Sequence, residues 1–158
     1  MKSLPVKPVR IAAHYGLRCR TDTSHAILKA GEYGRIMRLS DDTAVILLDG
    51  TQPRARQRYT AAHEIGHFLL GHIGKPSLHM SGGYAIRPEQ EVHADFFADS
   101  LLAPLCVLWA CGIVNGKDIA AMCCVPSDAA QRAAERVRAM PPPESKLEQI
   151  VMHHVRCK

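Results

Sequence analysis

The segment TAAHEIGHFLLGH, residues 60–72, contains the motif H-E-x-x-H at His63, Glu64 and His67. These residue types at this spacing are typical of a hydrolytic metal site. His63 and His67 are four residues apart, so on a helix both imidazoles project from one face and can bind one cation. Glu64 directly follows the first histidine, which places its carboxylate beside the metal rather than on it. There it can take a proton from a water that attacks a carbonyl and deliver that proton to the leaving amine. The pattern indicates hydrolysis of a peptide bond.

A catalytic zinc site usually has three protein ligands and an open position for water, so a third ligand is needed. Glu91 is the best candidate, because Glu91 and Asp95 lie four residues apart on a second expected helix. Ala94 and Ala98 are small enough to let that helix approach the first one closely. Glu91 would then complete a site for one Zn²⁺ per chain. Asp95 would accept the free ring N–H of a ligand histidine and fix its tautomer.

Other polar residues have weaker claims to a role in this site. His72 lies five residues beyond His67, whereas the three-histidine zinc pattern requires six, so we do not expect it to be a ligand. The six cysteines include no C-x-x-C pair, which argues against a structural zinc site and favours reduced, packed thiols. Candidate donors for stabilising the transition state are Tyr84, His79 and Tyr59.

The elements that must position these residues follow from apolar periodicity and turn signals. We expect a first helix over residues 9–15, strands over 35–39 and 44–48, and a loop over 49–58. The site helix should run from an N-cap at Thr60 to about residue 70 and, being apolar on every side, should be buried. Further helices are expected over residues 89–102, 105–111, 118–122 and 127–139. Strands followed by helices predict an α+β fold, with the apolar run AVILL as a central strand.

Length and composition favour a single folded domain. With 158 residues, 47% of them hydrophobic, we expect a domain over 1–140 and a tail over 141–158 with a short amphipathic helix. Residues 1–8 lack the apolar stretch of a signal peptide, and the uncharged run 100–116 is shorter than a bilayer span. We therefore expect a cytoplasmic protein that does not enter a membrane. The net charge of +5 is scattered and aromatic residues are few, which gives little support to nucleic-acid binding.

Three segments of the chain form a specific combination: RYTAAHEIGHFLLGH, EVHADFFADSLLAP and IAAMCCVPSDAAQRAAERV. Together they resemble the ImmA/IrrE family of metallo-endopeptidases. The resemblance implies a minimal zincin-like fold of the thermolysin type, in which a small sheet packs on the active-site helix and the C-terminal half is helical. It implies zinc at His63, His67 and Glu91, with Glu64 as the catalytic base.

The resemblance also implies a substrate and a role in transcription regulation. Members of the family typically cut helix-turn-helix repressors, so that a mobile element or a stress regulon is switched on. We expect the substrate peptide to lie extended along an edge strand beside the site helix, pairing through backbone hydrogen bonds.

Functions of other classes stay open. A non-proteolytic regulator could bind a repressor or DNA and use zinc mainly to hold its shape, and a component of a toxin–antitoxin-like pair is a further alternative. The two helices around VPSDAAQRAAERVR could form a helix-turn-helix with Gln131, Arg132 and Arg136 facing DNA, although we do not expect direct DNA binding. The apolar segment 105–114 could form a homodimer surface, but we expect it to lie in the core.

Overall fold

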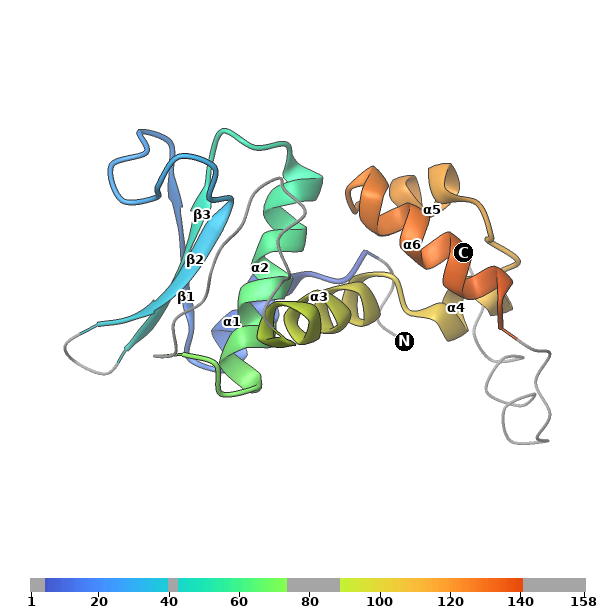
Figure 1. Cartoon of the computed structure of the whole chain (residues 1–158), viewed down its shortest axis with the longest axis horizontal. Helices are drawn as coiled ribbons and strands as arrows, with labels where there is room; N and C mark the ends of the chain where they lie inside the picture. The colour runs from blue at the N-terminus through green and yellow to red at the C-terminus, as the bar shows by residue number, and fades with distance from the viewer. Residues whose placement is uncertain (1–4, 40–42, 74–88, 141–158) are drawn as a thin grey trace. The chain divides into compact units, whose positions relative to one another are not determined.

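The structure is a computed structural model that describes residues 5–39, 43–73 and 89–140. Within these residues the chain forms a helix, three strands and five further helices, labelled along the chain in Figure 1. This arrangement confirms the predicted α+β class. The described residues divide into two compact units, one within residues 7–98 and the other formed by residues 99–140 with 5–6. The domain predicted over 1–140 stays a prediction, and the predicted tail helix lies outside the described residues.

The sheet has the strand order β1-β3-β2. Its centre is the apolar strand β3 (Ala44–Asp49), as predicted. β2 (Gly34–Arg38) pairs antiparallel with β3, and Ile36 lies opposite Ile46 in that ladder. β1 (Arg18–Asp22) pairs parallel with β3 on the other side and was not predicted. This edge strand is mostly exposed and reads RCRTD, so it lacks the alternation of apolar and polar residues that reveals a half-buried strand.

The site helix is α2 (Arg54–Leu69), and it begins earlier than predicted. Thr60 is not an N-cap, because it lies inside the helix and is buried. The residue before the helix is Pro53, and the Arg, Ala and Gln residues that follow it have high helix propensity. The loop predicted over 49–58 is therefore wrong in its second half. The predicted stop is confirmed, since Gly71 follows the helix with a left-handed φ of +71°.

α2 is the central helix of the unit formed by residues 7–98. It packs against β2, β3 and α1 (Pro8–His14), and Figure 1 shows it beside the sheet. The core is a cluster of buried apolar side chains from α1, the sheet and α2: Ala12, Leu17, Ala44, Ile46, Leu48, Ala61 and Ile65. The predicted burial of α2 is confirmed from Tyr59 to His67, whereas Leu69 and Leu70 are exposed. Both histidines of the motif thus lie in the part of the helix that the core holds in place.

α3 (Glu89–Leu102) has the predicted bounds and comes very close to α2. A Cβ atom added at Gly66 of α2 would lie 3.1 Å from Cδ1 of Phe97 and 3.3 Å from Cα of Ala94. The small size of Ala94 therefore permits the close approach, as predicted, and Gly66 is its counterpart on the facing helix. Through this approach, carboxylates of α3 reach the histidine face of α2.

The second unit contains the end of α3 and three further helices: α4 (Leu105–Ala110), α5 (Gly116–Cys123) and α6 (Ser127–Arg138). Their positions confirm the three predicted helices, with shifts of one or two residues at the ends. α6 packs against α4 and α5. It buries Ala129, Ala130, Ala133, Ala134 and Val137.

The apolar segment 105–114 is only partly inside the protein. Leu108 is fully buried, while Cys106 and Val114 are exposed. The expectation that this segment belongs to the core thus holds for Leu108 but not for its whole length. A homodimer through this surface stays a prediction.

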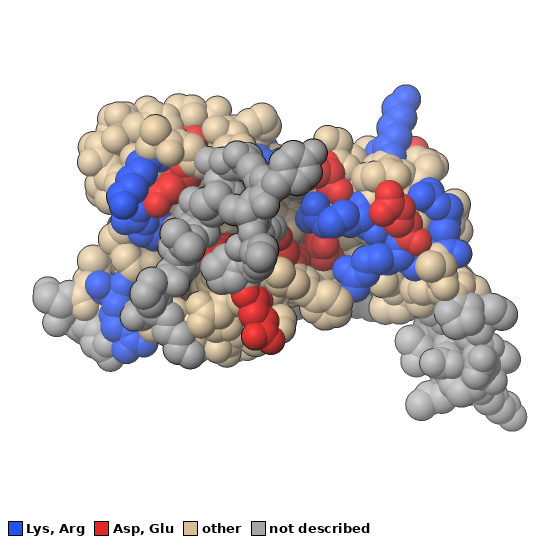
Figure 2. Space-filling model, in the orientation of Figure 1, with Lys and Arg blue, Asp and Glu red and all other residues tan. Residues whose placement is uncertain are grey.

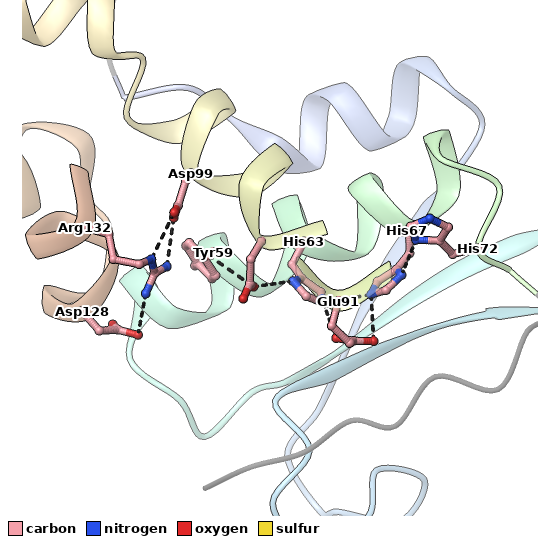
Figure 3. A network of polar contacts seen from close by, with 9 residues as sticks. Tyr59, His63, His67, His72, Glu91, Asp99, Asp128 and Arg132 are labelled. Atoms are coloured by element: carbon pink, nitrogen blue, oxygen red, sulfur yellow. Dashed lines mark hydrogen bonds and ion pairs between the residues drawn. The ribbon is translucent and has the colours of Figure 1, made fainter. Parts of the chain in front are cut away.

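An ion pair joins α3 to α6 within the second unit. Arg132 donates to Asp99 from Nε over 3.1 Å and from Nη2 over 3.0 Å, as Figure 3 shows. This two-point contact holds a carboxylate that is 8% exposed. Nη1 of Arg136 lies 3.9 Å from the same carboxylate. Two of the three side chains considered for contact with DNA bases are therefore engaged with Asp99.

The cysteines of the described residues are in two states. Cys19, Cys106, Cys123 and Cys124 are free thiols, as predicted, and burial raises the pKa of the Cys19 thiol. Cys111 is disulfide-bonded, so the prediction of a reduced thiol is wrong for this residue. Spacing rules such as C-x-x-C do not detect cysteines that only the fold brings together.

One stretch of the described residues, Glu89–Ala110, is long and apolar enough to pass a simple test for a membrane span. It consists of α3 and α4 in succession, and Pro104 lies between these helices. A core helix of a soluble protein passes the same test. The stretch is therefore weak support for a membrane protein.

The close approach of α2 and α3 can be tested at Gly66. Helix propensity alone predicts that Gly66→Ala stabilises the protein by roughly 0.5–1 kcal/mol. The contacts with Phe97 and Ala94 predict the opposite sign, a loss of about 1–3 kcal/mol, because the added methyl group overpacks the contact. Urea unfolding of the metal-free protein measures the difference. A Gly66→Ala protein more stable than wild type would show that the helices are not in tight contact here.

Candidate metal centre

The site is built on two helices, with His63, Glu64 and His67 on α2 and Glu91 and Asp95 on α3. The two imidazoles lie one helical turn apart on the same face of α2, with 2.9 Å between their Nε2 atoms. Figure 3 shows the carboxylate of Glu91 lying against both rings. The structure thus brings together the residues that the sequence placed on two separate helices.

Three donor side chains converge at the centre of the site. The Nε2 atom of His63 lies 3.2 Å from Oε2 of Glu91, and the Nε2 atom of His67 lies 3.3 Å from Oε1 of the same carboxylate. The three side chains are buried, and each offers a donor within 4.8 Å of the others. Two ligands held about 2.0–2.1 Å from one ion at a tetrahedral angle would be roughly 3.3–3.4 Å apart. The two nitrogen–oxygen distances and the chemistry of these donors therefore fit a metal ion, which would separate the two Nε2 atoms from their present 2.9 Å.

Asp95 supports the first histidine from the opposite side of its ring. Its Oδ1 atom lies 2.9 Å from Nδ1 of His63. The hydroxyl of Tyr59 donates to the same oxygen over 3.4 Å. With Nδ1–H donating to Asp95, the lone pair of Nε2 is directed at the convergence point. This is the placement that the sequence predicted for Asp95.

Glu64 points to the sheet. Its Oε2 atom accepts a hydrogen bond of 2.8 Å from the backbone N–H of Ile36 in β2, and the residue is 1% exposed. The sequence did not indicate Ile36, because a backbone donor has no side-chain signature. The contact places the carboxylate of Glu64 at the edge of β2.

His72 contacts the second histidine. Its Nδ1 atom lies 3.1 Å from Nδ1 of His67, on the side of that ring remote from Glu91. Among the described residues, the group that could hold a metal is His63, His67 and Glu91, and it does not include His72. That His72 is not a ligand stays a prediction, and its contact with His67 was not predicted.

Of the three sequence candidates for a transition-state stabiliser, one lies among the described residues. Tyr84 and His79 lie outside the described residues. Tyr59 is buried and its hydroxyl is bonded to Asp95, which gives it a supporting position behind His63.

The buried charges of the site shift the protonation of its groups. Burial opposes a charge on His63, but hydrogen bonds to Asp95 and Glu91 outweigh it and raise the pKa of His63 to about 9. For Glu91, burial acts to raise the pKa, while the contacts with His63 and His67 dominate and lower it well below its usual range. In the metal-free protein, a proton on His63 therefore balances the buried carboxylates at neutral pH.

A metal ion must displace that proton, since a histidine ligand has to be neutral. We expect Zn²⁺ binding at pH 7 to release close to one proton, and the affinity to fall up to about tenfold per pH unit below pH 9. Calorimetric titration in two buffers of different ionisation enthalpy measures the protons released. Binding without proton release at pH 7 would show that His63 is not displaced from its protonated state.

The same shift predicts how the stability of the metal-free protein depends on pH. The raised pKa of His63 contributes stability that is complete below its ordinary pKa of 6.5 and is lost as the pH rises through about 9. Unfolding of the metal-free protein at pH 6.5 and pH 9.5 should therefore show a lower stability at the higher pH. His63→Gln should reduce this difference, because it removes the titrating ring.

Comparison with known proteins gives one family. No curated protein matches the chain, and no solved structure does. A family model, Peptidase_M78, described as the IrrE N-terminal-like domain, matches residues 25–138, which is more than two thirds of the chain. The matched region includes both site helices and all five residues placed at the centre. By this match and by the resemblance in its motifs, the chain belongs to the Peptidase_M78 family of the ImmA/IrrE type.

Proposed function

We propose that this protein is a zinc-dependent endopeptidase that cuts a regulatory protein in the cytoplasm. The observation that carries the proposal is the convergence of His63, His67 and Glu91, with Glu64 on the helix of the two histidines and bonded to the edge of the sheet. Membership of a peptidase family supports the same reaction class.

The donor set supports zinc as the metal. Two imidazole nitrogens and one carboxylate oxygen are a ligand set that catalytic zinc uses, with a fourth position left open for water. Bound there, zinc would supply a Lewis acid and a water of lowered pKa. His63, His67 and Glu91 would hold one such ion per chain, and Asp95 would keep His63 in the ligating tautomer.

Glu64 is the proposed general base. Its carboxylate would accept the proton of the attacking water and deliver it to the amine of the departing peptide. The hydrogen bond from the N–H of Ile36 holds Oε2 in a fixed direction, so the proton-accepting group needs little reorganisation before the reaction.

The outer edge of β2 is the proposed binding strand for the substrate. Among the described residues β2 pairs with β3 alone, and the N–H of Ile36 is bonded to Glu64. Backbone groups of alternate residues point to the same edge, so Gly34 and Arg38 share the outward direction of Ile36. An extended peptide that pairs there would run beside Glu64.

The proposed substrate is a helix-turn-helix transcriptional repressor of a mobile element or a stress regulon. This step rests on the resemblance to the ImmA/IrrE family, whose members typically act on such repressors. Cytoplasmic location follows from the same proposal, because the repressor acts there.

A second candidate function has one observation in its favour. Glu64 is 1% exposed and already bonded to Ile36, as expected for a carboxylate that helps to hold the fold together. The protein would then be a non-proteolytic regulator that binds a repressor and uses its metal for stability. Direct binding to DNA gains less support, because Arg132 is bonded to Asp99 and Figure 2 shows acidic side chains among the basic ones.

Glu64→Gln separates the two functions. The amide keeps the size of the side chain and an oxygen that can accept from Ile36, but it cannot take a proton. The endopeptidase predicts unchanged zinc content and a loss of roughly 10²- to 10⁴-fold in cleavage rate. New protein N-termini should be compared in cells that express wild type or Glu64→Gln at equal levels.

Fragments that appear with wild type alone would identify the substrate and its cleaved bond together. Glu91→Ala is the matched control, since it should remove both zinc and cleavage. Equal N-terminal profiles for wild type and Glu64→Gln, with zinc present in both, would contradict the proposed peptidase and favour the regulator.

A further inference from the structure

The C-terminus of α2 ends in a turn that folds the chain back onto the helix. The N–H of His72 donates to the carbonyl of His67 over 2.8 Å, and the N–H of Gly71 donates to the carbonyl of Phe68 over 3.1 Å. With Gly71 at a φ of +71°, these two bonds form a Schellman motif. In this motif the second residue after the cap lies over the residue five positions before it, and that pair commonly makes an apolar contact.

Here that pair consists of two imidazoles. His72 occupies the position after the glycine, and His67 is the residue beneath it. Their ring centroids are 5.2 Å apart, and their Nδ1 atoms are at a hydrogen-bonding distance of 3.1 Å. His72 is 9% exposed, so the contact is largely shielded from water. The turn therefore places a possible hydrogen-bond acceptor, Nδ1 of His72, beside the ring of His67. An apolar side chain at position 72 would be enough to cap the helix.

We propose that His72 is a positioning residue for the metal ligand His67. The Nε2 atom of His67 faces His63 and Glu91, which leaves Nδ1 as the nitrogen that must carry the proton when the ring ligates. Nδ1–H of His67 then donates to Nδ1 of His72, which accepts as the neutral tautomer protonated on Nε2. The proposal rests on the proposed metal site.

His72 would do for His67 what Asp95 does for His63. A histidine ligand usually donates its other ring N–H to a partner that fixes its tautomer and orientation. For the first ligand this partner is a carboxylate of α3, and for the second it is a neutral imidazole held by the cap of α2. The two supports come from different elements, so loss of one should leave the other ring in place.

Two substitutions at position 72 distinguish positioning from capping. His72→Leu keeps a buried side chain of suitable size for the apolar contact of a Schellman motif, but it removes the acceptor. His72→Asn loses apolar area, but it can place an amide oxygen near the position of Nδ1. If His72 only caps the helix, His72→Leu should reduce Zn²⁺ affinity less than His72→Asn does. If His72 positions His67, His72→Asn should be the variant that reduces Zn²⁺ affinity less.

The measurement is the affinity of the full chain for Zn²⁺, by competition with a chromophoric chelator, together with unfolding of the metal-free protein. We expect His72→Leu to lose about 10- to 100-fold in affinity while the metal-free unfolding midpoint stays within error or rises. His72→Asn should recover most of that affinity although its midpoint is lower. In the Co²⁺-substituted protein, the visible absorption of His72→Leu should shift from that of wild type.

The proposal would be overturned if His72→Leu bound Zn²⁺ as tightly as wild type does. It would also be overturned if, in both variants, the loss of Zn²⁺ affinity rose and fell with the loss of the metal-free unfolding midpoint. Glu91→Ala distinguishes this failure from failure of the metal site itself. If wild type and Glu91→Ala bind Zn²⁺ equally, the proposed site is wrong. If Glu91→Ala alone loses Zn²⁺ and His72→Leu does not, only the role of His72 is wrong.

Discussion

Burial of carboxylates against imidazoles between two helices is the constraint on which the site depends. Glu91 is 3% exposed and lies against His63 and His67, while Asp95 lies behind His63. Buried charges must be paired, and removing one partner typically costs about 3–5 kcal/mol. In the metal-free protein the positive charge is the proton on His63, whose pKa is about 9. A metal ion would replace that proton with a charge that satisfies all three donors together.

The rest of the described unit serves to hold this arrangement in place. α1 and the sheet bury the middle of α2, and the missing side chain at Gly66 lets α3 approach within reach of the histidines. The sheet also supplies the backbone N–H of Ile36 to Glu64. His63, His67 and Glu64 are thus each in contact with a group outside the three donors, Asp95, His72 and the N–H of Ile36 respectively, as a preorganised site requires.

How far the sequence predicts the site depends on the kind of interaction involved. Residues at helical spacing, such as His63 and His67 or Glu91 and Asp95, could be paired because the period of a helix is fixed. The sequence predicts the start of α2 too late, because the arginine-rich segment before Thr60 lies in a predicted loop although its residues favour helix. The sequence does not predict β1, because this strand lacks the alternation of apolar and polar residues. It cannot predict the hydrogen bond from Ile36 to Glu64 either, because any residue except proline can supply a backbone N–H. His72 is an intermediate case, since a glycine stop at position 71 places the next residue over His67 whenever a Schellman motif forms.

The central claim is that the buried group of His63, His67 and Glu91 holds a metal ion. Anomalous X-ray diffraction, recorded on both sides of the zinc absorption edge from crystals of zinc-loaded protein, tests it most directly. The account predicts one strong peak about 2.0–2.2 Å from Nε2 of each histidine and from the Glu91 carboxylate. Zinc bound elsewhere on the chain, with direct contacts between Glu91 and the two imidazoles retained, would contradict it.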